Sequence, residues 1–127
     1  MIYQKQSRFS PDELDQPIRD AAQRHRFGVL NVLDLRATLR NKGIDLGSEA
    51  RVYDICNPQA ASQALAHDPA VATLLPCRIA VYSTAAGSTL AMVHPTDLFA
   101  ASGLHIDSTL PADVERELIA IIDEAAG

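Results

Sequence analysis

The fold of this chain is decided by one stretch, CRIAVYSTAAGSTLAMV at residues 77–93. Two runs rich in β-branched and apolar residues, 77–83 and 89–93, flank the small turn residues Ala85-Ala86-Gly87-Ser88. Short runs of this kind on either side of a glycine-containing connection are typical of a β-hairpin. The stretch therefore predicts two adjacent antiparallel strands.

Three further strands are expected upstream of the hairpin. Residues 50–56 alternate between two faces, and residues 2–9 alternate weakly, which is typical of an edge strand. The run FGVLNVL at residues 27–33 is apolar on both alternating faces. Such a run indicates a strand that is covered on each side or paired in a dimer, so we expect this strand to lie centrally in the sheet.

The first helix has a clear start and one complication. Ser10-Pro11-Asp12-Glu13 supplies an N-cap, a first-turn proline and an acid three residues after the cap. Pro17 removes one backbone hydrogen bond in the second turn. The helix, which continues to about His25, is therefore expected either to kink at Pro17 or to begin regularly only near Asp15.

The remaining helices are predicted from caps and apolar stripes. They are a short helix from residue 35 to Gly43, one at 58–66, one turn at 71–75, a short helix at 95–101 and a longer helix at 111–126. In the last, Val114, Leu118, Ile121, Ile122 and Ala125 share one stripe.

Length and composition favour one ordinary globular domain over residues 1–127. Apolar residues make up 47% of the chain and charged residues 21%. No apolar stretch approaches the ~20 residues that cross a bilayer, and residues 1–10 lack an apolar signal core. We therefore expect a cytoplasmic protein whose two cysteines are reduced thiols, not a disulfide.

The charge of −5 argues against nucleic acid or an anionic membrane as a partner, since both reward clustered basic residues. Residues 1–51 hold nine basic and seven acidic residues, whereas residues 52–127 hold two basic and nine acidic ones. This asymmetry favours a two-fold assembly in which unlike ends meet, or else it reflects polar faces on different helices.

Two cysteine-bearing stretches are the candidate site: Cys56-Asn57-Pro58, where a strand should end, and Pro76-Cys77-Arg78, where the next should begin. Asn57 and Pro58 are suited to start a helix, whose N-terminus favours a thiolate at Cys56. Arg78 can do the same for Cys77. If the two strands are antiparallel, both thiols lie at one end of the sheet. The alternative is that both cysteines are small apolar residues filling strand–helix junctions.

The sequence carries few signs of a metal site or of a known catalytic motif. The four histidines show no ligand spacing, so a cluster of Cys56, Cys77 and His94 would have to be assembled by the fold. We expect no metal and no cofactor. The glycines are scattered singly, without a nucleophile elbow, a dinucleotide fingerprint or a phosphate loop, and the sequence assigns no reaction.

Several of these residues carry a family resemblance. Phe27-Gly28-Val29-Leu30, Arg36-Ala37-Thr38-Leu39, Cys56-Asn57-Pro58, Asp68-Pro69 and Leu74-Leu75-Pro76-Cys77 occur in the order seen in the domain-of-unknown-function 302 family of small prokaryotic proteins. The chain resembles this family over about residues 8–125. The resemblance implies an antiparallel sheet and homodimers, but no established activity. With the elements above, we expect an α+β fold: a single mainly antiparallel sheet of four to five strands packed by helices, as a two-layer sandwich.

Three positions depart from the family pattern. Val32 and His94 stand where acidic residues are common, and Arg78 stands where asparagine is usual. Arg78 favours an anion. We expect a homodimeric module with a cleft formed by Cys56, Asn57, Pro58, Pro76, Cys77, Arg78 and His94, which binds a small, anionic ligand or a protein partner. The alternatives are a thiol-based redox or sulfur-handling protein using Cys56 and Cys77, and a structural subunit of a larger complex.

Overall fold

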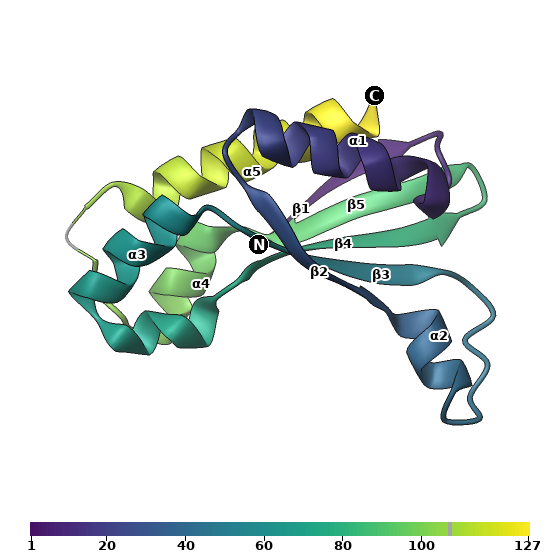
Figure 1. Cartoon of the computed structure of the whole chain (residues 1–127), viewed down its shortest axis with the longest axis horizontal. Coiled ribbons are helices and arrows are strands. Elements are labelled where there is room, and N and C mark those ends of the chain that lie inside the picture. Colours follow the sequence, from purple (N-terminus) through teal and green to yellow (C-terminus); the bar gives the residue numbers. More distant parts are fainter. Residues whose placement is uncertain (107) are drawn as a thin grey trace.

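The computed structural model describes residues 1–106 and 108–127 and contains one five-stranded sheet. Its strands are β1 (Ile2–Ser7), β2 (Gly28–Asp34), β3 (Ala50–Cys56), β4 (Cys77–Thr84) and β5 (Gly87–Val93). They lie in the order β1-β5-β4-β3-β2, and every neighbouring pair is antiparallel (Figure 1). The α+β class and the hairpin β4–β5 are thus confirmed, and β1 is an edge strand as predicted.

Two helices cover one face of this sheet. Helices α1 (Pro11–Arg24) and α5 (Leu110–Ala126) lie side by side over the strands (Figure 1). The core between the layers is apolar and fully enclosed, and burying each Leu or Ile in it contributes about 1.5–3 kcal/mol. Its largest members are Leu14, Ile18, Tyr53, Ile55, Ile79, Leu90, Leu118, Ile121 and Ile122. The stripe predicted on the last helix is therefore the face that packs on the sheet.

Helix α1 begins where its sequence signals predicted. The Ser10 hydroxyl accepts a hydrogen bond from the Glu13 N–H, and the Glu13 carboxylate accepts one from the Ser10 N–H. The helix then runs unbroken from Pro11 through Pro17. A regular start only near Asp15 is therefore wrong, because the capping box stabilises the first turn upstream of the second proline.

The central position expected for residues 27–33 is also wrong, because β2 is the other edge strand. It pairs only with β3, with a bulge between Val29 and Asn31. Val29 and Val32 pack against the core, whereas the Leu30 side chain is 64% exposed and that of Leu33 40%. Only Val29 and Val32 of this strand are therefore covered by the same chain. Leu30 and Leu33 are not.

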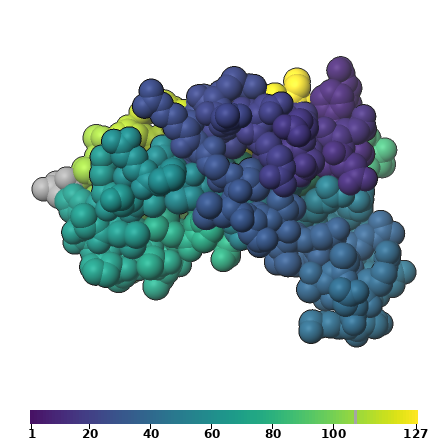
Figure 2. All heavy atoms as spheres, in the orientation of Figure 1, coloured from purple at the N-terminus to yellow at the C-terminus, as the bar shows by residue number. Residues whose placement is uncertain are grey.

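The remaining elements lie at the two ends of the molecule. Helices α3 (Pro58–His67) and α4 (Pro95–Ser102) and the 3₁₀ helix η1 (Pro69–Leu74) gather beyond one end of the sheet. Helix α2 (Leu35–Arg40) projects at the opposite end, and the space-filling outline is notched between the two lobes (Figure 2). Among the residues described, no helix is long and apolar enough to span a membrane.

Candidate functional site

The candidate site lies at the end of the sheet where β3 stops and β4 begins. Ile55 of β3 is directly opposite Cys77 of β4, and the two strands are antiparallel. Cys56 follows Ile55, so both cysteines lie at the same end of the sheet. The antiparallel arrangement on which the cysteine hypothesis depends is therefore the one observed.

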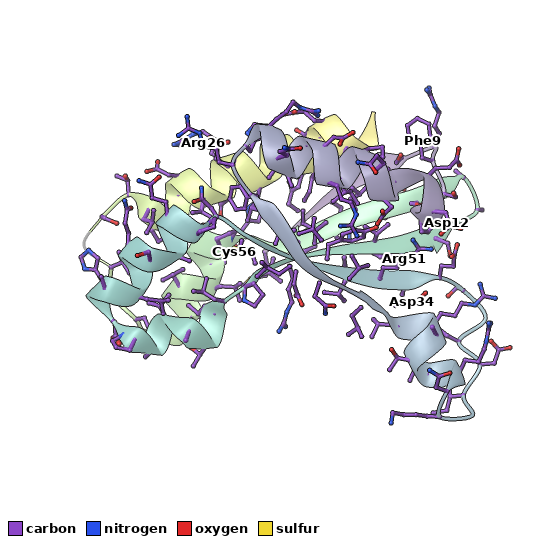
Figure 3. All side chains as sticks on the ribbon, viewed as in Figure 1. Phe9, Asp12, Arg26, Asp34, Arg51 and Cys56 are labelled. Carbon is purple, nitrogen blue, oxygen red and sulfur yellow. The ribbon has the colours of Figure 1, made fainter. Side chains whose placement is uncertain are left out.

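The chain changes from strand to helix immediately after Cys56 (Figure 3). The Asn57 backbone is extended, and its side chain accepts a 3.1 Å hydrogen bond from the N–H of Ala60. Pro58 is the first residue of α3, where its fixed φ suits the helix and its missing N–H has no consequence. This cap fixes the direction in which α3 leaves the sheet.

A cavity of about 280 Å³ opens between this helix and the end of the sheet. Its volume is near the lower end of the ~300–1,000 Å³ range of small-molecule pockets. The small residues Ala60, Ala61 and Ala64 of α3 form one wall. Apolar residues of α4 and the first half of α5 also line it: Pro95, Leu98, Phe99, Leu110, Pro111, Val114 and Leu118. The pocket is therefore suited to an apolar ligand.

Five of the predicted site residues line this pocket: Cys56, Asn57, Pro76, Cys77 and Arg78. The other two do not. Pro58 starts α3 beside the lining residue Asn57, and His94 has partners outside the lining. The His94 ring lies 3.4 Å from the Glu115 carboxylate and packs edge-on against Tyr3.

Across residues 1–106 and 108–127, no group of three or more His, Cys, Asp or Glu side chains is placed to hold a metal ion. The cluster of Cys56, Cys77 and His94 that the sequence left open is not assembled there.

Both thiols are held in their neutral form. Burial raises the pKa of the Cys77 thiol to about 11, and the neighbouring Cys56 adds to the shift. Burial also raises the pKa of Cys56. Loss of hydration disfavours the charged thiolate, so both shifts run opposite to the lowering expected from the N-terminal end of α3. The arrangement therefore lacks a stabilised thiolate.

Arg78 serves a different role from the one expected beside Cys77. Its Nε lies 3.5 Å from Oδ1 of Asp54, directly across the sheet on β3. The Arg78 side chain is 70% exposed, so the guanidinium remains accessible at the rim of the pocket. It offers the rim a positive charge and several N–H donors.

Sequence reasoning missed the wall that α4 and α5 contribute. Val114 and Leu118 belong to the stripe that predicts core packing, and they do face inward. Helix α5 extends past the end of the sheet, however, so the apolar residues of its first turns line the pocket and do not pack on a strand. A helix longer than the strands it covers is the signal that could have located this wall.

Comparison with known proteins agrees with this fold. A family model described as "Domain of unknown function DUF302" matches residues 3–125. A crystal structure of an uncharacterized conserved protein DUF302 from Bacillus stearothermophilus superposes with a TM-score of 0.91 at 26% sequence identity. The match covers 98% of this chain and 97% of that one. No curated protein matches the chain. On the extent of the family match, the chain belongs to the family of domain of unknown function DUF302.

Proposed function

We propose that this protein is a homodimeric binding module whose pocket beside Cys56 and Cys77 takes a small ligand. The observation that carries the proposal is the apolar cavity of about 280 Å³ with its polar groups gathered at Asn57, Arg78 and the two thiols. A concave apolar site with a few convergent polar groups is the usual form of a small-molecule site.

Filling the pocket tests this proposal. Ala61 lines the cavity on α3, so Ala61→Phe should occupy it. Ala66→Phe, at an exposed position of the same helix, is the matched control. Titration with 1-octanol, followed by ¹⁵N–¹H correlation spectra, should shift amides of α3, α4 and the first half of α5 in the wild type and in Ala66→Phe. Shifts that persist in Ala61→Phe, or that scatter over the surface, would contradict the proposal.

The homodimer is supported by the uncovered edge strand. The outer side of β2 has backbone groups without a neighbouring strand, and such edges are templates for pairing with another chain. Leu30 and Leu33 of β2, and Ile44 and Leu46 of the connection to β3, are all exposed. A two-fold axis beside β2 would place these residues in the interface of both subunits, because a two-fold interface uses the same surface patch on each.

Light scattering after size-exclusion chromatography tests the dimer. The wild type should have twice the mass of one chain, and Leu30→Lys should reduce the mass to that of a monomer. Leu65→Lys, which places the same charge at an exposed leucine of α3, should leave the dimer intact. A wild-type monomer, or equal behaviour of the two variants, would remove β2 as the interface.

A further inference from the structure

The charge on the side chains that line the pocket is positive. Among the described residues that line it, Arg78 is the only one with a charged side chain. The first turns of α3, α4 and α5 all contribute lining residues, namely Ala60, Pro95 and Pro111 among others. The N-terminal ends of helices carry partial positive charge from their unpaired N–H groups. The wall and the rim therefore both favour negative charge.

Two carboxylates, Asp54 and Glu115, lie near the pocket. Asp54 faces Arg78 at 3.5 Å without a hydrogen bond to it, so a ligand can share the guanidinium. The Glu115 carboxylate accepts bonds of 3.1 and 2.8 Å from the N–H and hydroxyl of Thr96, next to the pocket wall. Neither acid lines the cavity. An anion at the rim would thus meet Arg78, which it would share with Asp54, and no lining carboxylate within the described residues.

The interior of the pocket is suited to the apolar part of a ligand. The cavity of about 280 Å³ has the volume of roughly nine waters at ~30 Å³ each. The two thiols are protonated at neutral pH, so they add no negative charge against an entering anion. Leu98 and Phe99 of α4, and Leu110 and Val114 of α5, line this space. A short alkyl chain of about eight carbons suits both the volume and the lining.

We infer that the pocket binds an amphiphilic anion, with a short apolar chain in the cavity and a carboxylate or phosphate head at Arg78. This inference rests on the proposed binding function and names its ligand class. The guanidinium forms paired hydrogen bonds with either head group, because both present two oxygens at matching spacing. The head remains at the solvent rim, so its hydration is only partly lost.

Isothermal titration with matched eight-carbon probes tests the inference. The probes are octanoate, octyl phosphate, 1-octanol and octyltrimethylammonium, titrated into the wild type, Arg78→Gln and Ala61→Phe. Arg116→Gln is the matched control, because Arg116 is the other basic residue after residue 51 and lies outside the pocket. Octanoate should bind at least about fivefold more tightly than octanol, in line with a charge-assisted contact at an exposed arginine. The cation should bind more weakly than octanol.

The variants and the chain length give independent readouts. Arg78→Gln should bring octanoate to the affinity of octanol while leaving octanol unchanged, and Arg116→Gln should change neither. From hexanoate to octanoate, each added methylene should tighten binding about fourfold, the equivalent of its transfer from water. All binding should be lost in Ala61→Phe.

The possible outcomes separate this inference from the proposed function. If octanol binds in the pocket but octanoate binds no more tightly, or Arg78→Gln has no effect, the anionic class is overturned and the binding module stands. If no probe binds, both are overturned. If both anions depend on Arg78, the class is supported, and the tighter of octanoate and octyl phosphate identifies the head group.

Discussion

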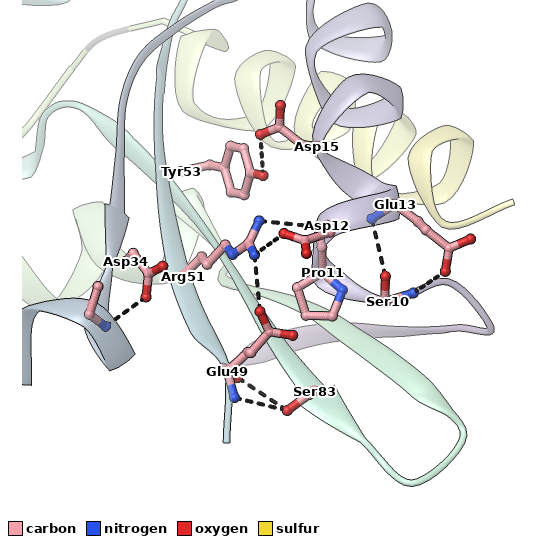
Figure 4. A network of polar contacts seen from close by, with 11 residues as sticks. Ser10, Pro11, Asp12, Glu13, Asp15, Asp34, Glu49, Arg51, Tyr53 and Ser83 are labelled. Carbon is pink, nitrogen blue, oxygen red and sulfur yellow. Dashed lines mark hydrogen bonds and ion pairs between the residues drawn. The ribbon is translucent and has the colours of Figure 1, made fainter. Parts of the chain in front are cut away.

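The phenol of Tyr53 donates a 2.6 Å hydrogen bond to Asp15, and this contact joins the middle of the sheet to helix α1 (Figure 4). Arg51, two residues earlier on β3, forms ion pairs with Asp12 of the same helix and with Glu49. Burial and the nearby Asp15 raise the pKa of Tyr53 to about 12, so its hydroxyl stays protonated and donating. A polar seam formed by Asp12, Asp15, Arg51 and Tyr53 thus fixes α1 over the first half of β3, away from the pocket.

Removing the hydroxyl should loosen this seam. Tyr53→Phe leaves Asp15 with Arg19 at 3.0 Å but without its buried donor. We expect the free energy of unfolding at pH 7 to fall by about 1–2 kcal/mol, the usual effect of orphaning one partner of such a bond. Urea denaturation measures it. Tyr82→Phe, at a half-buried position on the other face of the sheet, is the control, and an equal loss there would contradict the role of the hydroxyl.

His25 should make stability depend on pH. It caps the end of α1 and contacts the carboxylates of Glu117 and Glu124 on α5. The Glu124 hydrogen bond, followed by that of Glu117, raises the pKa of His25. The stabilisation is therefore complete below the unfolded pKa of ~6.5 and is lost as the pH rises through the higher folded pKa.

Denaturation curves collected from pH 6 to pH 8, where the thiols of the unfolded chain remain mainly protonated, check this expectation. His25→Gln should abolish the fall in stability above neutral pH, whereas His67→Gln, at an exposed position, should retain it. A wild-type curve that is flat across this range, or one that His25→Gln leaves unchanged, would show that the contacts with α5 do not favour the charged imidazole.

The thiols should react slowly in the folded protein. With the pKa of Cys77 near 11 and that of Cys56 also raised by burial, the thiolate fraction at pH 7 is very small. Alkylation by iodoacetamide, followed by mass spectrometry, should be slow at pH 7 and accelerate as the pH rises, with Cys56 ahead of Cys77. Rapid modification of either residue at pH 6 would instead favour thiol-based redox chemistry.

Gly87 should tolerate no side chain. A Cβ there would lie 2.3 Å from the carbonyl oxygen of Ser7 and 2.6 Å from the carbonyl carbon of Arg8, and its φ is +145°. Gly87→Ala should therefore lower the free energy of unfolding by more than about 2 kcal/mol. At Gly28, a Cβ meets nothing within 4 Å, so Gly28→Ala should change stability by less than about 1 kcal/mol. Equal losses in denaturant would refute the close approach.

Local signals predicted most elements of this fold. Asn57-Pro58 and Ser10-Pro11 start helices because capping depends on a few adjacent atoms, and β3 has the predicted bounds. The position of β2 could not be derived in this way. A run that is apolar on both faces is equally suited to a buried strand and to an edge that meets another surface, and only strand order distinguishes the two.

The sequence predicted only the part of the site that depends on local signals. The cysteine stretches lie at strand ends, and antiparallel pairing brought them together at one rim. The pKa shifts could not be anticipated, because they depend on how much water the surrounding helices exclude. Leu98 and Phe99 carry no motif, and their role follows from the position of α4 beyond the sheet.

The pairing of β1 with β5 has a consequence for assembly on the ribosome. Tyr3 bonds to Asp123, and the Ser7 hydroxyl bonds to the carbonyl of Ala126. Strand β1 precedes the hairpin and α5 in the chain, so it must wait for both before its contacts exist. Nascent chains stalled before α5 should remain accessible to protease at residues 1–10, and the final step of folding should bring β1 and α5 together.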